Sequence, residues 1–266
     1  NEDSFFSSSI KSIKIPQSVT VIKKGAFAFC DQLEQLEIAS DSKIEIFDEE
    51  VFYDTRIKSI TFPSELTELK EGWCAETPAL TKIAVSPMNP RFCSYKDKMI
   101  LGKTIFNQEY YDCIILCVRD IKRIQIPNFI ENICSHSFSN CNQLETIEFS
   151  SDSKLQAIDE CAFASSSIKS IKIPKSVTMI GLGAFADCKL EKIMIPNDSQ
   201  LEIIQNVAFS NSIFRSIKIP PLVNSIGPNA FNELLLIIEI SNPKMIPTYH
   251  DFLINCQNAL LMIPIE

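Results

Sequence analysis

The side chains best suited to chemistry in this chain are ten cysteines and two histidines, and their spacing argues against an active site. His136 and His250 do not belong to a recognisable catalytic motif that would combine them with a placed carboxylate and nucleophile. The chain has no glycine-rich phosphate loop, nucleophile elbow or His-x-x-x-His zinc spacing. Carboxylates are numerous, but they recur at regular intervals instead of converging. We therefore expect no enzymatic activity, no metal site and no cofactor.

The cysteine positions favour free thiols over a disulfide framework. Cys30, Cys141 and Cys188 each lie three residues after a phenylalanine, and Cys256 lies four residues after one. If these are equivalent positions in successive coils, they are several strand spacings apart, and a disulfide needs Cα atoms about 4.4–6.8 Å apart. We expect buried thiols that pack as small hydrophobes.

An irregular long segment, Leu80–Asp120, leaves other interpretations of its cysteines open. A disulfide between Cys93 and Cys113 is one of them. A metal site built from Cys113 and Cys117 is weaker, because neither histidine is close in sequence.

A repeat of about 23 residues must position all of these side chains. The decapeptide SSSIKSIKIP occurs at residues 7–16 and again at 165–174. A repeat of this length predicts a solenoid, in which each coil buries its apolar row only against its neighbours. Its anchor pattern, Ile/Leu-x-x-Ile-x-Ile, starts at Ile10, Leu33, Ile57, Leu80, Ile121, Leu144, Ile168, Leu190, Phe214 and Leu235.

Within each coil, two apolar positions alternate with a polar one, which predicts a strand with one buried face. The Ala-Phe segment that follows is rich in small residues, and we expect a short helical turn that packs its phenylalanine inward. The third coil has Trp73-Cys74 in this place. The phenylalanines of this row are Phe27, Phe52, Phe138, Phe163, Phe185, Phe209, Phe231 and Phe252.

The expected outward face of these strands carries alternating charges. It holds eleven basic and six acidic residues, so it is near +5, while the chain as a whole carries −8. One interpretation is a charge ladder that stabilises neighbouring strands. The other is a basic binding face that attracts an acidic protein patch. The basic residues are Lys11, Lys14, Lys58, Lys82, Lys122, Arg123, Lys169, Lys172, Lys192, Arg215 and Lys218.

Nucleic acid is not the expected partner, because this face has no interleaved aromatic residues on which bases could stack. The long segment Leu80–Asp120 is a second candidate for binding, with Tyr95, Tyr110 and Tyr111 as interface anchors. Residues 112–118 predict an extra strand within it. The alternative is a tolerated irregular coil without a partner.

The pattern Ile-x-Ile-Pro-x-x-Val-x-x-Ile-x-x-x-Ala-Phe-x-x-Cys-x-x-Leu resembles the BspA-like leucine-rich repeat family, most closely at residues 13–33 and 171–190. The resemblance covers nearly the whole chain. It implies an α/β, right-handed leucine-rich-repeat superhelix with a parallel sheet on its concave face and short helical turns and loops on its convex face. It also implies a surface protein that binds host or matrix proteins.

We therefore expect one domain over residues 1–266, with about ten repeats, as a fragment of a longer array. The expected function is a non-catalytic adhesion ectodomain, monomeric, at the cell surface or secreted, with an extracellular-matrix or host surface protein as partner. No apolar run is long enough to span a membrane. Asn197 begins a glycosylation sequon, which would be modified only after secretion. The alternatives are an intracellular scaffold for a cytosolic partner and a spacer between other domains.

Overall fold

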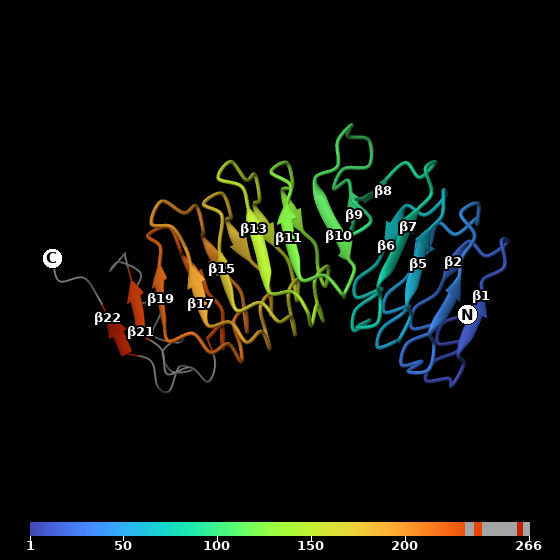
Figure 1. Cartoon of the computed structure of the whole chain (residues 1–266), viewed down its shortest axis with the longest axis horizontal. Helices are drawn as coiled ribbons and strands as arrows, with labels where there is room; N and C mark the ends of the chain where they lie inside the picture. The colour runs from blue at the N-terminus through green and yellow to red at the C-terminus, as the bar shows by residue number, and fades with distance from the viewer. Residues whose placement is uncertain (232–236, 241–259, 263–266) are drawn as a thin grey trace. The chain divides into compact units, whose positions relative to one another are not determined.

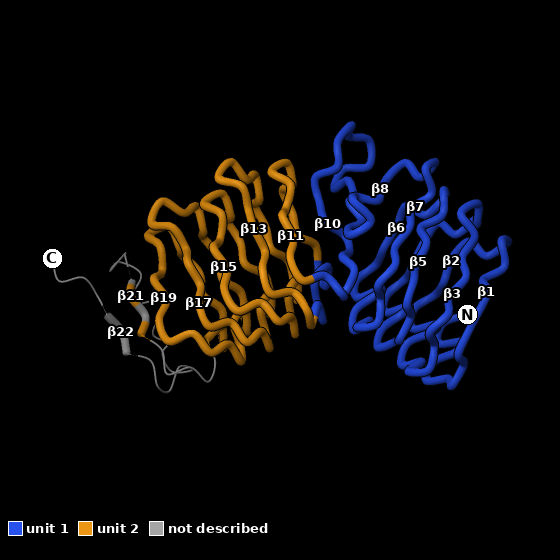
Figure 2. Tube along the Cα trace, viewed as in Figure 1, with its two compact units in different colours: residues 1–121, 135–141 blue, residues 122–134, 142–266 orange. Residues whose placement is uncertain are grey.

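The computed structural model describes residues 1–231, 237–240 and 260–262 as a solenoid of β-strands. Its chain divides into two compact units (Figure 2). Unit 1 contains residues 1–121 and 135–141, and unit 2 contains residues 122–134 and 142–266. The single domain over residues 1–266 stays a prediction. Within each unit, the strands of successive coils lie side by side (Figure 1).

The predicted Ile-x-Ile strands are present in both units, and the pairs that the structure records are parallel. Their alternation is confirmed in β15, where Ile171 is buried between exposed Ser170 and Lys172. In unit 1 these long strands are β1 (Ser12–Lys14), β3 (Gln35–Glu37), β5 (Ser59–Phe62) and β7 (Lys82–Val85). In unit 2 they are β11 (Arg123–Ile126), β13 (Thr146–Phe149), β15 (Ser170–Lys172), β17 (Lys192–Met194), β19 (Ser216–Ile219), β21 (Ile237–Ile240) and β22 (Leu260–Met262).

Most long strands pair in register two at a time, as in β1–β3 and β15–β17, whereas β19, β21 and β22 form a sheet of three. In two of the pairs, a side chain in the loop after one strand donates to an aspartate in the loop of the next coil. Gln17 donates to the Asp41 carboxylate at 3.0 Å, and Asn128 donates to Asp152 at 2.7 Å. Hydrogen bonds between loops thus join neighbouring coils in these two pairs.

A second row of short parallel strands forms another side of each coil, and each strand contributes one buried side chain in most coils. In unit 1 these strands are β2 (Val21–Ile22), β4 (Ile46–Phe47) and β6 (Glu68–Leu69). In unit 2 they are β12 (Asn132–Ile133), β14 (Ala157–Ile158), β16 (Met179–Ile180), β18 (Ile203–Ile204) and β20 (Ser225–Ile226).

The prediction of short helical turns, and with it the α/β class, is wrong: no helix occurs among the described residues. Two left-handed residues four positions apart flank four of the Ala-Phe segments, such as Gly183 (φ 56°) and Asp187 (φ 58°). A right-handed helix cannot include such residues. Instead, Phe185 N–H donates to the carbonyl of Ala208 in the next coil at 2.8 Å. The segment is therefore a stack of turns joined coil to coil.

Replacing Gly183 by valine should lower the free energy of unfolding by about 1–2 kcal/mol, because a β-branched residue resists the left-handed conformation. A Cβ at this position would also lie 3.3 Å from the sulfur of Cys161. Gly183→Asn should lower the free energy of unfolding by less, since asparagine tolerates the left-handed conformation. Urea unfolding followed by circular dichroism measures both variants, and equal losses would contradict the explanation.

The phenylalanine row forms the core, as predicted. Phe163, Phe185, Phe209 and Phe231 stack in unit 2 with ring centroids 5.2–5.4 Å apart and planes within 5° of parallel. All four are buried. Phe252 lies outside the described residues. In unit 1, Phe27 stacks on Phe5 at 5.2 Å and on Phe52 at 5.7 Å.

Trp73 replaces the phenylalanine of the third coil and packs differently. It stacks on Phe47 of β4 at 5.5 Å and meets the edge of Phe62 at 5.5 Å. The larger indole ring of Trp73 thus packs toward β4 and β5 and does not continue the row of stacked phenylalanines.

The long segment folds as an antiparallel meander of β8 (Phe92–Tyr95), β9 (Met99–Gly102) and β10 (Cys113–Cys117). The predicted extra strand over residues 112–118 is therefore confirmed. Its start is held by Asn89, whose amide donates to the carbonyls of Pro63 and Leu66 at 2.7 and 2.8 Å. The Asn89 side-chain oxygen accepts from the N–H groups of Arg91 and Phe92 at 2.9 and 2.8 Å.

Candidate functional site

All eleven basic residues proposed for binding are exposed, and each lies in a long strand or directly before one. We call the outward side of the long strands, with the residue that precedes each, the strand face. Lys11, Lys14, Lys58 and Lys82 lie on the strand face of unit 1. The strand face of unit 2 carries Lys122, Arg123, Lys169, Lys172, Lys192, Arg215 and Lys218.

Part of this basic charge is neutralised across neighbouring coils, as the charge ladder predicts. Lys14 pairs with Glu37, Lys58 with Glu34 at 2.5 Å, Lys169 with Glu191 at 3.9 Å, and Lys218 with Glu239 at 2.8 Å. The hydrogen bond from Lys58, together with its charge, lowers the pKa of Glu34. These pairs are exposed, so each contributes little to stability.

The other seven basic residues have no ion-pair partner within the part of the chain that the structure describes. Five of them lie in unit 2, whose strand face also carries Glu145 and Glu148 without an ion-pair partner among the described residues. The seven are Lys11, Lys82, Lys122, Arg123, Lys172, Lys192 and Arg215.

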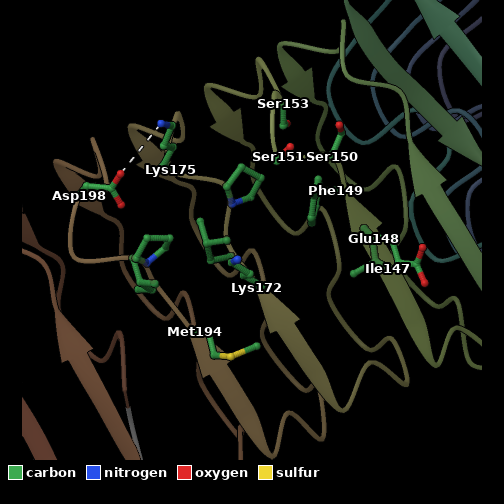
Figure 3. A pocket seen from close by; sticks show the side chains of 14 residues that line it. Ile147, Glu148, Phe149, Ser150, Ser151, Ser153, Lys172, Lys175, Met194 and Asp198 are labelled. Carbon is green, nitrogen blue, oxygen red and sulfur yellow. Dashed lines mark ion pairs between the residues drawn. The ribbon is translucent and has the colours of Figure 1, made fainter.

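A groove of about 830 Å³ opens on unit 2 where β13, β15 and β17 end (Figure 3). Lys172 of β15 lies in it beside Met194, its partner in the β15–β17 register. Met194 is 42 % exposed, and Phe149 adds a half-buried aromatic ring. Lys175 and Asp198 pair at 4.0 Å across the next two turns. The groove thus combines the ammonium group of Lys172 and the carboxylate of Glu148, neither in an ion pair among the described residues, with exposed apolar surface.

A second depression, of about 610 Å³, lies on the strand face of unit 1. Lys14 and Lys58 line it, but both are paired with glutamates that line it too. Apart from Lys82, its charges are therefore already compensated. The groove of unit 2 is the better candidate for a binding site, because exposed Met194 gives it an apolar centre.

In the long segment, Tyr110 is exposed as predicted, but Tyr95 and Tyr111 are half-buried. Lys103 lies over the Tyr111 ring at 5.3 Å. The sequence interpretation missed Ile105 and Phe106, which are 68 % and 46 % exposed in the loop between β9 and β10. Two consecutive apolar residues in a predicted loop were the signal that could have found them.

The nine cysteines among the described residues are free thiols, including Cys93 and Cys113. The predicted burial of Cys30, Cys141 and Cys188 is confirmed, while Cys256 lies outside the described residues. A hydrogen bond explains this shared position in two of the coils. The thiols of Cys30 and Cys188 each donate to a backbone carbonyl of the preceding coil. Burial raises the pKa of Cys188 to about 11, so this thiol is neutral and inert.

His136 is half-buried, and burial lowers its pKa. His250 lies outside the described residues. No group of three potential metal ligands occurs in the described ranges, and no helix there could cross a membrane. Asn197 is exposed in the turn after β17, whereas Ser199 of the same sequon is buried.

Comparison with known proteins agrees with the repeat architecture. The profile of a family described as the BspA type leucine rich repeat region matches in six copies over residues 1–95, 103–237 and 178–264. No curated protein sequence matches the chain significantly.

Several solved structures share the fold. The chain resembles the pneumococcal vaccine antigen PcpA, with a TM-score of 0.67 and 24% identity over 90% of this chain and 53% of that one. It resembles a leucine-rich cell surface protein of Faecalibacterium prausnitzii, with a TM-score of 0.67 and 21% identity over 97% and 60%. A leucine-rich repeat protein of Eubacterium ventriosum gives a TM-score of 0.69 and 18% identity over 90% and 68%. The chain thus spans 53% and 60% of the length of the first two.

Proposed function

Because the chain belongs to the BspA-type leucine-rich repeat family, we propose that it is a non-catalytic binding protein whose strand face recognises another protein. The groove of unit 2 carries this proposal. It places unpaired Lys172 beside exposed Met194 on a rigid, hydrogen-bonded array of strands. A rigid surface of this kind loses little conformational entropy on binding.

The expected partner is a protein with an acidic surface patch and an apolar side chain at the centre of that patch. Five unpaired basic residues of unit 2 would attract the acidic groups, and Met194 with Phe149 would bury the apolar one. We place this binding at the cell surface, with a host or matrix protein as partner. The Faecalibacterium protein is a cell surface protein and PcpA is a vaccine antigen, which supports that setting.

Charge reversal on the strand face tests the proposal. The triple variant Lys122→Glu, Lys169→Glu and Lys172→Glu should weaken binding to an immobilised panel of matrix and serum proteins by about tenfold or more. The dependence of affinity on salt should also become shallower, because fewer charges are screened. Surface plasmon resonance at two salt concentrations measures both effects.

A matched control carries the same change in net charge away from the strand face. Lys23, Lys43 and Lys189 are exposed and lie outside the long strands, so their reversal to glutamate should leave affinity within about twofold. Equal losses in the two triple variants would indicate a nonspecific effect of net charge. Unchanged binding in the strand-face variant would show that the binding site does not lie on the strand face.

An intracellular scaffold is the second candidate, favoured by one observation. The nine described cysteines are all free, and free thiols persist in reducing compartments. The same strand face would then hold a cytosolic partner. A signal peptide in the gene of the full-length protein would decide for the cell surface.

A further inference from the structure

One turn of unit 1, residues 135–141, is held to two other parts of that unit. These residues belong to unit 1, although the chain on either side of them belongs to unit 2. The N–H of Cys117, at the end of β10, donates to the Ser137 carbonyl at 2.9 Å. The Asn140 amide donates to the Glu76 carboxylate at 2.7 Å. The turn is therefore fixed to the long segment and to the coil of Trp73.

The imidazole of His136 is packed in this turn where a positive charge has no acceptor. Its Nδ1 atom is buried and has no hydrogen-bond partner among the described residues. The ring lines a cavity of about 10 Å³ together with Trp73, Cys74 and Leu116. All three of these neighbours are buried. The cavity is at the lower limit of what one water molecule needs, so little solvent can stabilise a charge there.

A positive charge already lies beside this ring. Arg119 follows β10 and is 2 % exposed. Its guanidinium donates to the carbonyl of His136 at 3.3 Å and to that of Ser137 at 2.8 Å. Neither Arg119 nor His136 forms an ion pair with a carboxylate in the part of the chain that the structure describes. Burial first, and the charge of Arg119 second, lower the pKa of His136.

The thiol that shares the cavity with His136 supplies no compensating negative charge. It belongs to Cys74, and burial raises its pKa, so it is neutral at neutral and acidic pH. The other titratable groups of the elements packed here are the thiols of Cys117 and Cys141 and the carboxylates of Glu76 and Asp120.

We propose that His136 is an acid-sensitive switch that releases the turn of residues 135–141 from its site in unit 1. In the folded protein, protonation places a second cation next to Arg119 and an N–H group without an acceptor at the buried Nδ1. In the unfolded chain, the imidazole lies in water and takes up a proton without either cost. Acid therefore favours states in which the turn has left its site.

Unit 1 should lose stability as the solution becomes mildly acidic. The pKa of His136 in the folded protein lies below the ordinary value of 6.5. Well above pH 6.5 the imidazole is neutral in both states, and the stability of unit 1 is complete. As the pH falls through 6.5, the unfolded chain takes up the proton first, so stability decreases until the pKa of the folded state is passed.

Trp73 reports on this switch, because the single tryptophan of the chain lines the same cavity as His136. Its fluorescence is followed during urea unfolding of the intact chain at about pH 8 and about pH 5, the range in which histidine titrates. We expect the urea concentration at the midpoint to be lower by about 0.5 M or more at the acidic pH.

Two matched variants assign this decrease to one histidine. His136→Asn removes the charge, and asparagine tolerates the positive φ of 59° at this position. The decrease in its urea midpoint should be less than about half of that in the unaltered chain. His250→Asn removes the other histidine and should retain the full decrease. A full decrease in His136→Asn, or its loss in His250→Asn, would overturn the proposal.

A second measurement does not depend on how well the His136 variant folds. In the His250→Asn chain, His136 is the only histidine, so its Cε1–H resonance can be followed alone by nuclear magnetic resonance. Under native conditions it should titrate with a midpoint below pH 6.5. A midpoint at or above this value would contradict the switch. Neither measurement requires a binding partner, so both are independent of the proposed function.

Discussion

Replacing Phe185 by alanine should lower the free energy of unfolding of unit 2 by about 3–5 kcal/mol, the usual cost of removing a buried phenylalanine. Phe185 is fully buried and stacks on Phe163 at 5.2 Å and on Phe209 at 5.4 Å. Phe185 N–H donates to the next coil, and the carbonyl of the adjacent Ala184 accepts from Phe163 of the preceding one, so the coils cannot collapse into the cavity. A solenoid coil has no other core to rely on, because each coil contacts only its neighbours.

Urea unfolding followed by far-ultraviolet circular dichroism measures this loss. Phe106→Ala is the matched control, since the same ring is 46 % exposed in the loop between β9 and β10. Its loss should stay below about 1 kcal/mol, as expected for an exposed position. Similar losses in the two variants would mean that the phenylalanine stack does not hold the coils together.

Replacing Asn89 by alanine should lower the stability of unit 1 by about 3 kcal/mol or more. Asn89 is 6 % exposed, and its side chain makes four hydrogen bonds to backbone groups at 2.7–2.9 Å. Two of these bonds reach the preceding coil, and two hold the start of β8. Each buried backbone group left without a partner costs about 1–3 kcal/mol.

Trp73 fluorescence during urea unfolding reports on unit 1, since this single tryptophan packs against Phe47 and Phe62. Asn107→Ala, at an exposed position in the same long segment, is the control and should change stability by less than about 0.5 kcal/mol. A loss below about 1 kcal/mol in Asn89→Ala would show that water replaces the amide, and that the long segment folds without this bridge.

The sequence alone was sufficient for the repeat, the strand positions and the buried phenylalanine row. These features depend on residue type at a fixed spacing, and a period of about 23 residues recurs with little variation. The outward position of the eleven basic residues followed from the same alternation. Burial of Ile171 between exposed Ser170 and Lys172 is the direct result of a strand with one buried face.

The tertiary structure decided the features that depend on contacts between coils. The Ala-Phe segments have good helix-forming residues, yet hydrogen bonds to the next coil, such as Phe185 to Ala208, favour turns with left-handed residues. Glu34 pairs with Lys58 of the following coil and not with Lys11 of the preceding one. The buried Arg119, which follows the antiparallel meander, contacts the sulfur of Cys141, a contact that no spacing in the sequence indicated. Local pattern specifies the coil, whereas partner choice depends on distances that exist only after the coils have stacked.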